Sequence, residues 1–448
     1  MERHRKFIFD SYSFDPNSKI LSLRYFQDDE LFFLEAIEFP SGKHLDGDEL
    51  EVLDGIFRYL HLAAGISYYK LFISREIEVR TTKLSEEQAE FFNNFYRNGL
   101  GEFSYKNNII DLSERINFPH SSRTEKNSRL DFNLEKRTAI AIGGGKDSLV
   151  TLEIARKHMD NLLLCSVGKA KPIVDLMKMT GLEYFNVNRS ISSNLLDLNK
   201  RLDEIGGYNG HVPISGIIAF ILLAASIIQG FDRILMSNER SANIGNLNFN
   251  GVTINHQWSK SFEFEKSINS FIKKHILSGF EYLSFLRPLS EIHIAKLFAN
   301  FRQYHSVFAS CNGNFKIENK TGRWCCHCPK CRFVFLMLAV YLNKNDMIEI
   351  FGMDLLDDET QLDGFLELCG VHGHKPFECV GEIEESIYAI SNLNKSFKDD
   401  YIVKKLHSVL PPVNSQELER RLFTLSREHL LGQELETILN SVLGLPII

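Results

Sequence analysis

The spacing of hydrophobic residues changes character near residue 130 of the chain. Before that point, three segments alternate apolar and polar residues with a period of two, which is typical of half-buried β-strands, and two longer segments have helical periodicity. The expected strands are Lys6–Phe14, Ile20–Tyr25 and Glu30–Glu38, and the expected helices are Leu50–Ala64 and Leu84–Asn98. Residues 1–130 are therefore predicted to form an N-terminal α+β module, followed by a polar linker at His120–Asn133.

From about residue 135, short apolar runs alternate with helical segments. The expected strands are Thr138–Ile142, Leu162–Val167, Tyr184–Val187 and Arg233–Met236, and the clearest helices between them are Leu149–His158 and Ile214–Ile228. Strand, crossover helix, strand is the pattern of a parallel sheet with helices on both faces. We therefore predict an α/β fold, with a doubly wound parallel sheet in residues 135–332 and a mainly helical region in residues 333–448.

Composition narrows the class of protein. The 448 residues are 44% hydrophobic and 24% charged, which is ordinary for a globular protein of two or three domains. The net charge of −7 argues against a nucleic-acid partner, although it allows an anionic substrate in a locally positive pocket. The longest apolar run, residues 214–228, is short for a membrane span, and the charged N-terminus does not resemble a signal peptide. We expect a cytoplasmic protein without membrane partners; its oligomeric state is not predicted.

The segment after the first strand of the sheet carries the clearest chemical signal. A hydrophobic run ends at three glycines, which let backbone N–H groups approach an anion, and a helix is expected to begin directly after them. The unpaired N–H groups of that helix point to the same place. The predicted nucleotide-binding residues are Gly143, Gly144, Gly145, Lys146, Asp147 and Ser148. Lys146 would supply positive charge, Asp147 an oxygen ligand for Mg²⁺ and Ser148 a hydroxyl donor.

This loop differs from the two commonest phosphate-binding motifs, because it has neither the spacing of a Walker A motif nor that of Gly-x-Gly-x-x-Gly. It resembles the PP-loop of N-type ATP pyrophosphatases, written Ser-Gly-Gly-x-Asp-Ser, and this resemblance implies that ATP is split into AMP and diphosphate. Gly143 stands where that motif has its first serine, so one phosphate-binding hydroxyl is missing from the loop. The alternative is an ordinary glycine turn, capped by Asp147 or Ser148.

Polar residues also gather where other strands are expected to end, and ligands of open parallel sheets bind beyond the carboxyl ends of the strands. Asn238, Glu239 and Arg240 follow the fourth expected strand. Glu239 is a candidate for binding metal or ribose, and Arg240 for binding phosphate or carboxylate. Two histidines in polar segments, His211 and His256, are candidates for acid/base work. The alternatives are solvated loops and structural histidines.

Cysteines cluster near the end of the predicted sheet region. Thiolates in a C-x₂-C-x₂-C pattern can surround one tetrahedral cation at about 2.3 Å, and a further cysteine upstream would complete the shell. The predicted ligands of a structural zinc ion are Cys311, Cys325, Cys328 and Cys331, with Cys326 and His327 as alternates. An iron–sulfur cluster or unliganded thiols are the other interpretations. Such grouping indicates a reducing compartment. The remaining cysteines, Cys165, Cys369 and Cys379, are interpreted as core residues.

A PP-loop followed by this cysteine cluster resembles the deazaguanine nitrile synthases, which are shorter and lack the N-terminal module. Nearly the whole chain resembles the MurL-type UDP-N-acetylmuramoyl-L-alanyl-L-glutamate epimerases. The segments that carry this second resemblance are Gly143–Ser148, Gly210–Pro213, Ser237–Gly245, Asn255–Ser261, Leu286–Leu289, Cys311–Asn312, Trp324–Cys331 and Lys375–Gly381.

The resemblance to the epimerases implies ATP-dependent inversion of the terminal L-glutamate of a peptidoglycan precursor, with release of AMP and diphosphate. The implied substrate is a small nucleotide-sugar dipeptide. The sequence does not assign a role to residues 1–130, which are a candidate for holding the nucleotide-sugar part on the basis of their size alone. Adenylation would remove the carboxylate charge that makes the Cα proton hard to abstract. Lys146 and Asp147 would serve ATP and Mg²⁺, and Arg240 would hold a substrate carboxylate.

The sequence does not assign the acid/base pair of this reaction, for which His211, His256 and Glu239 are the candidates. Two other functions stay open. One is another PP-loop ligase or transferase, such as an enzyme that modifies a nucleobase or tRNA. The other is a nucleotide sensor that binds without turnover.

Overall fold

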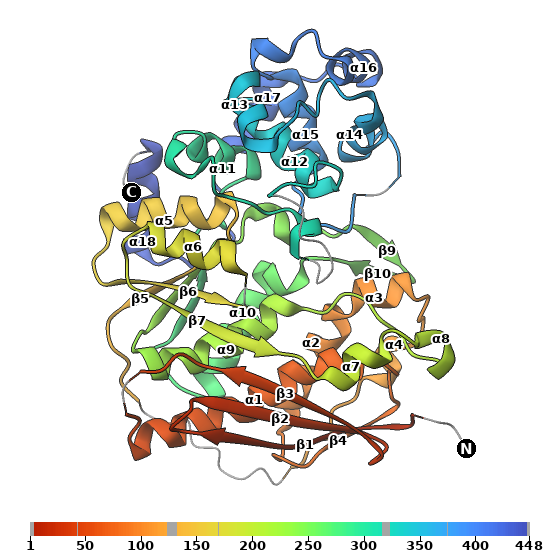
Figure 1. The fold of residues 1–448 in the computed structure, drawn as a ribbon, viewed down its shortest axis with the longest axis vertical. Coiled ribbons are helices and arrows are strands. Elements are labelled where there is room, and N and C mark those ends of the chain that lie inside the picture. The colour runs from red at the N-terminus through yellow and green to blue at the C-terminus, as the bar shows by residue number, and fades with distance from the viewer. Residues whose placement is uncertain are drawn as a thin grey trace.

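A sheet of nine strands runs through the part of the chain that the computed structural model describes, and helices pack on both of its faces (Figure 1). The described residues are 4–42, 44–122, 132–168, 170–315, 323–373 and 375–445. The strand order is β11-β8-β5-β6-β7-β3-β2-β1-β4, and β9 pairs with β10 in a separate hairpin. The predicted α/β class, with a large and mostly parallel sheet and a helical C-terminal region, is confirmed.

The sheet has a parallel part and an antiparallel part. The parallel strands are β11 (Glu281–Ser284), β8 (Arg233–Met236), β5 (Thr138–Ala141), β6 (Leu162–Val167) and β7 (Tyr184–Ser190). The N-terminal strands are β1 (Lys6–Asp15), β2 (Ile20–Gln27) and β3 (Leu31–Glu38), which run antiparallel, and β4 (Glu76–Val79), which is parallel to β1. The hairpin strands are β9 (Leu247–Phe249) and β10 (Val252–Ile254). The sequence analysis did not predict β4, β9, β10 or β11, each of which has three or four residues.

The two parts of the sheet meet where β3 pairs antiparallel with β7, in a register that places Ile37 opposite Arg189. A buried ion pair holds this junction: Arg189 Nε lies 2.6 Å from Glu35 Oε1, and the hydroxyl of Tyr68 donates to the same carboxylate at 2.8 Å. The N-terminal strands therefore continue the parallel sheet and extend it by four strands.

Each face of the sheet is covered by its own set of helices (Figure 1). The first set comprises α1 (Gly47–Tyr69), α2 (Glu86–Gly99), α9 (Ile214–Gln229) and α10 (Phe262–His275). The second set comprises α5 (Lys146–His158) and α6 (Lys171–Met179), which pack on the strands. Beyond them, α11 (Glu291–Phe298) packs on α5, and α12 (Pro329–Leu338) and most of the helices that follow it form a lobe farther from the sheet (Figure 1). Short helices in the first half of the chain are α3 (Gly101–Lys106), α4 (Leu112–Arg115), α7 (Ser193–Leu198) and α8 (Leu202–Ile205). The later helices are α13 (Lys344–Phe351), α14 (Leu362–Leu368), α15 (Ile383–Ser391), α16 (Tyr401–Val409), α17 (Ser415–Phe423) and α18 (Gln433–Leu443).

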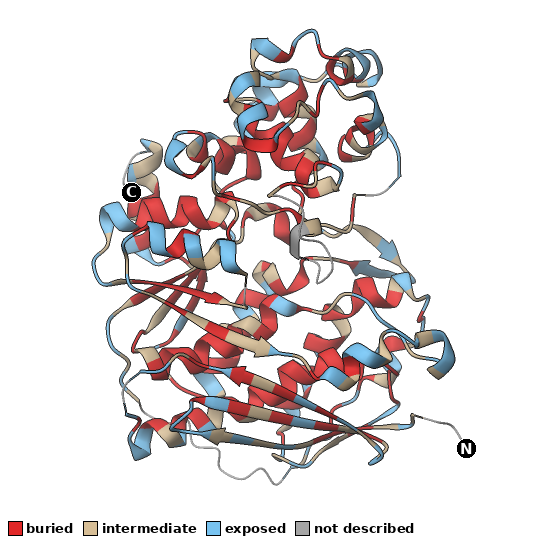
Figure 2. Cartoon of the chain, viewed as in Figure 1, coloured by how far each residue is buried: buried red, intermediate tan, exposed pale blue. Residues whose placement is uncertain are grey.

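Alternation along the strands divides the hydrophobic core into two layers. In β5, Ala139 belongs to one layer and Ile140 to the other, and Leu163 and Leu164 of β6 are divided in the same way. Successive side chains of a strand point to opposite faces, so strands that are apolar on both faces lie in the middle of the molecule. Figure 2 shows this pattern: buried residues fill the central strands and the inner helices, whereas exposed residues lie on the outer helices.

The apolar segment at residues 214–228 forms α9, whose residues are mostly buried against α1 and the sheet. No helix among the described residues is long and apolar enough to cross a membrane. Residues 123–131 of the predicted linker lie outside the described residues. The helical region predicted to begin at residue 333 is continuous with α12, which begins at Pro329.

Candidate active site

A cavity of about 330 Å³ lies beyond the carboxyl ends of β5, β6 and β8, where an open parallel sheet binds its ligands. The loop after β5 contributes Gly143, Gly145, Asp147 and Ser148, and the segment after β8 contributes Asn238 and Glu239. More distant segments contribute Lys260, Glu291, Ser310, Lys330 and Cys379. The cavity therefore brings together residues that are far apart in the sequence.

The glycine loop is shaped for close contact with a neighbouring backbone and with an anion. Gly144 has φ +84°, a left-handed conformation that residues with a Cβ rarely adopt. Its carbonyl accepts a hydrogen bond from Ala309 N at 3.0 Å, and an added Cβ would lie 3.4 Å from Ala309 O. Gly145 is the N-cap of α5, so the first N–H groups of that helix are directed toward the cavity. The loop therefore has the geometry expected of a phosphate-binding turn.

Ser310 brings a hydroxyl group to this loop, although no sequence motif marks the residue. A Cβ on Gly145 would lie 3.2 Å from Ser310 Cβ, so the two residues are in close contact. The hydroxyl of Ser310 is buried, and among the described residues it has no hydrogen-bond partner. In contrast, a Cβ on Gly143 would meet no atom within 4 Å. Buried polar groups are normally satisfied, so an unpaired hydroxyl in a cavity points to a ligand.

Lys146 and Asp147 are neighbours in sequence but face different surroundings. The ammonium group of Lys146 is buried and lies between the carboxylates of Asp147 and Glu291. Burial alone would lower the pKa of Lys146, but these two carboxylates raise it, so the group stays charged. Among the described residues, Asp147 lines the cavity and Lys146 does not. From behind the cavity wall, Lys146 therefore neutralises two carboxylates that line the cavity.

Glu291 connects this charge network to α12. Its carboxylate also lies 3.6 Å from Lys330 Nζ, and both side chains are almost entirely buried. Burial would raise the pKa of Glu291, but Lys146 and Lys330 hold it below its ordinary value. Lys330 itself lines the cavity and brings a positive charge to it.

Glu239 and Arg240 diverge at the end of β8. The carboxylate of Glu239 lines the cavity and accepts hydrogen bonds from Ala242 N at 2.8 Å and from Ser241 Oγ at 3.0 Å. Burial and the charge of Glu291 raise the pKa of Glu239. Asn238 also lines the cavity and donates to the hydroxyl of Ser284 at 3.0 Å.

Arg240 instead turns toward the C-terminal helices. Its guanidinium donates to Thr424 O at 3.2 Å, and its Nε lies 3.9 Å from Glu382. It lines a separate cavity together with Arg420 and Arg421. The structure therefore places Arg240 apart from the phosphate loop.

Arg287, in one of the segments that carry the MurL resemblance, is fully buried and supports the site from behind. It donates to Glu239 O at 2.9 Å and also to Lys260 O, and its guanidinium pairs with Glu265 Oε2 at 3.0 Å. These bonds fix the backbone on which two cavity residues, Glu239 and Lys260, are placed. Arg287 therefore satisfies buried carbonyl groups and does not line the cavity.

The two candidate histidines meet at Glu102 of α3. His256 hydrogen-bonds to this carboxylate, His211 Nδ1 lies 3.5 Å from it, and the two imidazole rings are 4.5 Å apart. Burial lowers the pKa of His211, with help from His256, to about 4. Burial also opposes the charge on His256, but Cys379 and Glu102 outweigh it and raise the pKa to about 9. His256 is therefore the charged member of the pair at neutral pH.

Cys379 was interpreted as a core residue, and that interpretation is wrong. Its thiol is only partly buried and lines the cavity, where Lys260 Nζ donates to its Sγ at 3.1 Å. Burial would raise the pKa of Cys379, but Lys260 and His256 lower it to about 6. The thiolate is therefore the prevailing form at neutral pH. The sequence did not reveal this, because Lys260 and His256 lie more than 100 residues away along the chain.

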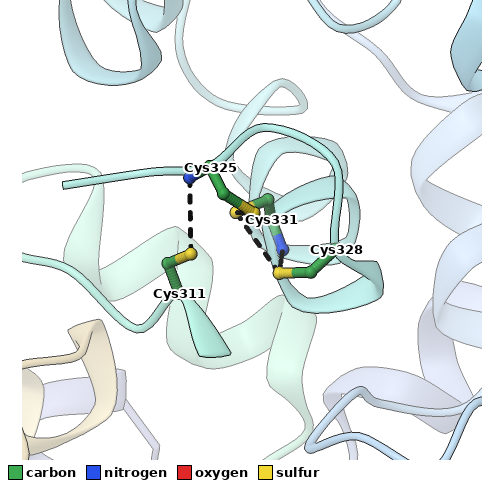
Figure 3. A group of neighbouring side chains, drawn as sticks. All are labelled: Cys311, Cys325, Cys328 and Cys331. Carbon is green, nitrogen blue, oxygen red and sulfur yellow. Dashed lines mark hydrogen bonds between the residues drawn. The ribbon is translucent and has the colours of Figure 1, made fainter. Parts of the chain in front are cut away.

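The cysteine cluster lies beside the cavity, at the start of α12 (Figure 3). The sulfur atoms of Cys311, Cys325, Cys328 and Cys331 all lie within 4.8 Å of one another. Cys331 Sγ is 3.7 Å from Cys325 Sγ and 3.5 Å from Cys328 Sγ. Four sulfurs bound to zinc at about 2.3 Å would be about 3.8 Å apart in a tetrahedron, so the spacing fits this ion.

The alternate ligands point elsewhere. The thiol of Cys326 contacts Phe351 O at 3.3 Å, and His327 Nδ1 lies 3.3 Å from the amide nitrogen of Gln361. The cluster is tied to the cavity through the backbone: Lys330 N donates to Glu378 Oε2 at 2.8 Å, and Glu378 directly precedes Cys379.

Family models match both halves of the chain. The MurL N-terminal domain matches residues 1–285, and the MurL C-terminal domain matches residues 307–421. The chain belongs to the MurL family. The first match spans β1 to β11, including the phosphate loop, and the second spans the cysteine cluster and Cys379.

Relatives of the MurL family resemble the chain over nearly its whole length. A protein of Xanthomonas oryzae pv. oryzae is 35% identical, with 94% of each chain covered. A protein of a Micromonospora species is 39% identical, with 92% of each chain covered, and one of Salinispora tropica is 38% identical, with 92% of this chain and 90% of the relative covered. Each of the three is named UDP-N-acetyl-alpha-D-muramoyl-L-alanyl-L-glutamate epimerase.

Proposed function

We propose that the protein uses ATP to invert the terminal L-glutamate of UDP-N-acetylmuramoyl-L-alanyl-L-glutamate, giving the D-isomer, AMP and diphosphate. The observation that carries this proposal is the single cavity in which a phosphate loop meets side chains suited to proton transfer. The names of the relatives supply the substrate and the outcome of the reaction. The isomerised product is a precursor of peptidoglycan.

The phosphate loop is the proposed ATP site. Gly143 and Gly145 line the cavity at the N-terminus of α5, and Ser148 and Ser310 place hydroxyl groups beside them. Asp147 is the carboxylate of this loop that faces the cavity, and it is the proposed ligand of Mg²⁺. The Mg²⁺ ion, when bound, would neutralise charge on the phosphates. Lys146 lies behind the cavity wall, where its ammonium group neutralises the negative charges of Asp147 and Glu291.

Adenylation explains why an epimerase would need this loop. A free α-carboxylate resists loss of the Cα proton, because the electron pair left behind would lie beside an existing negative charge. Attack of the carboxylate oxygen on the α-phosphorus of ATP releases diphosphate and gives a neutral acyl group, so the Cα proton becomes more acidic. Hydrolysis of the acyl-adenylate then returns the carboxylate and AMP. The ammonium groups that line the cavity, those of Lys260 and Lys330, favour anionic substrates there.

The cysteine cluster is the proposed site of a structural zinc ion. Four thiolates leave no position for a substrate, which is typical of sites that stabilise the fold. Its ligand Cys328 is also the N-cap of α12, so the ion would fix the first turn of the helix that carries Lys330. The proposed zinc ion therefore supports the cavity without entering the reaction.

Incubation with Mg-ATP and UDP-N-acetylmuramoyl-L-alanyl-L-glutamate in D₂O tests the proposal. We expect release of diphosphate, and D-glutamate that carries deuterium at Cα, because the abstracted proton is replaced from solvent. Diphosphate is measured by a coupled assay, and the configuration and isotope content of glutamate by chiral chromatography and mass spectrometry. Diphosphate release with unchanged L-glutamate would contradict the epimerase and favour another adenylating enzyme. No diphosphate from folded protein would contradict both steps.

The role of Ser310 is tested with Ser310→Ala. Loss of one hydrogen bond to a charged phosphate costs about 1.5–3 kcal/mol, so KM for ATP should rise roughly 10- to 100-fold. Ser306→Ala, at an exposed position of the same segment, should leave KM unchanged. Adding Gly143→Ser to the Ser310→Ala variant should restore part of the affinity, because position 143 has room for a side chain and would supply the missing hydroxyl. An unchanged KM for ATP in Ser310→Ala would contradict the assignment.

Metal analysis tests the zinc site. We expect one zinc ion per chain in the purified protein and none in Cys328→Ser, whose Tm should fall by about 10 °C or more, since a structural zinc ion contributes several kcal/mol to folding. Cys369→Ala removes a buried thiol outside the cluster and should keep its zinc. Iron and labile sulfide in the wild-type protein, or a Cys328→Ser variant that keeps full zinc content, would contradict the assignment.

A further inference from the structure

Cys379 faces the same space as the phosphate loop, although the two are more than 200 residues apart in the chain. It lies in the segment between α14 and α15, and its thiol shares the cavity with Asp147, Glu239 and Lys330. An acyl group activated at the loop would therefore lie within the cavity that this sulfur lines.

The surroundings of this sulfur differ from those of the other cysteines outside the cluster. Lys260 Nζ lies 3.1 Å from Cys379 Sγ, and Lys260 together with the imidazole of His256 lowers the pKa of this thiol. In contrast, Cys165 and Cys369 are buried in the core, and burial alone raises the pKa of their thiols. Of these three cysteines, Cys379 is therefore the one whose neighbours favour the thiolate.

A second layer of residues holds this arrangement in place. His256 hydrogen-bonds through Nδ1 to Glu102, which also lies near His211 and forms an ion pair with Lys106 at 2.5 Å. The backbone carbonyl of Lys260 accepts from the buried guanidinium of Arg287. A carboxylate behind an imidazole fixes its orientation and keeps it charged, as in other nucleophile and base pairs. The carboxylate of Glu102 therefore lies behind the imidazole of His256, and the thiolate of Cys379 faces the cavity.

We propose that Cys379 is the catalytic residue that removes the Cα proton of the activated glutamate, and that Lys260 and His256 are the residues that position and ionise it. This inference rests on the function proposed above. The thiolate takes the proton and becomes a thiol, and the electron pair of the broken C–H bond moves onto the acyl oxygen to give an enolate. The enolate collapses as Cα takes a proton from solvent on the opposite face, and the thiol returns its own proton to solvent. Hydrolysis then releases AMP from the inverted acyl-adenylate.

The central test is Cys379→Ala in the full-length, zinc-loaded protein. Adenylation does not need the thiol, so release of diphosphate and AMP should stay within about threefold of wild type, whereas inversion and deuterium uptake at Cα should fall by about 10²- to 10⁴-fold, the usual contribution of a general base. Cys369→Ala, which removes a buried thiol that does not line the cavity, should retain both activities.

The remaining outcomes each overturn the inference. Normal inversion by Cys379→Ala would show that another group moves the proton. Loss of diphosphate release in folded Cys379→Ala would place the thiol in adenylation instead. A covalent acyl-enzyme at Cys379 in the wild type, found by intact mass after rapid quenching, would make it a nucleophile. If the wild-type protein releases no diphosphate with this acceptor, the proposed function itself is contradicted. The wild-type protein alone therefore distinguishes that failure from a failure of the Cys379 assignment.

Thiol reactivity gives a second readout that a structural role would not produce. The groups that face Cys379 are the cations Lys260, His256, Lys330 and Lys375, and Glu102 acts through His256. Because the pKa of Cys379 is lowered to about 6, its alkylation by iodoacetamide should stay rapid down to about pH 6 and decline below it. In Lys260→Met the decline should shift to higher pH by about one unit or more. An unshifted profile, mapped to Cys379 by peptide mass spectrometry, would contradict the positioning role.

Discussion

The candidate site depends on the ion pairs that the buried carboxylate of Glu291 forms with two lysines. This carboxylate binds the ammonium groups of Lys146 from the start of α5 and Lys330 from the start of α12. A carboxylate taken out of water is costly unless it is paired, and removing one partner of a buried pair typically costs about 3–5 kcal/mol. Glu291 therefore ties the helix of the phosphate loop to the helix of the cysteine cluster. The cavity lies between these two attachments.

The charged residues around the cavity form two groups, one that faces the protein interior and one that faces the cavity. Lys146 and Arg287 face the protein, where they satisfy carboxylates and carbonyl groups that would otherwise be buried without partners. Asp147, Lys260, Lys330 and Cys379 face the cavity and remain available to a ligand. Within the second group, Lys260 lowers the pKa of Cys379 together with His256, so the thiol is ionised at neutral pH.

What the sequence predicted well is what lies close together along the chain. The glycine loop and the C-x₂-C-x₂-C cluster are local patterns, and so are most strands of the sheet. The sequence could not show that β3 would pair with β7, because a pairing across about 150 residues leaves no local period. It also could not show that Arg240 would turn away from the cavity while Glu239 lines it, since adjacent side chains at a strand end point in different directions. Ser310 and Cys379 were missed because the residues beside them in the cavity, Gly145 and Lys260, come from remote segments.

The central claim is that activation of the carboxylate and inversion of Cα occur in one cavity and in that order. Labelling the glutamate α-carboxylate with ¹⁸O tests this most directly, with the AMP analysed by mass spectrometry after a single turnover. If the carboxylate attacks ATP and water later attacks the acyl carbon, one ¹⁸O atom per turnover will be found in AMP. AMP without ¹⁸O, formed while D-glutamate appears, would mean that no acyl-adenylate hydrolysed in this way lies on the path, and it would contradict the account.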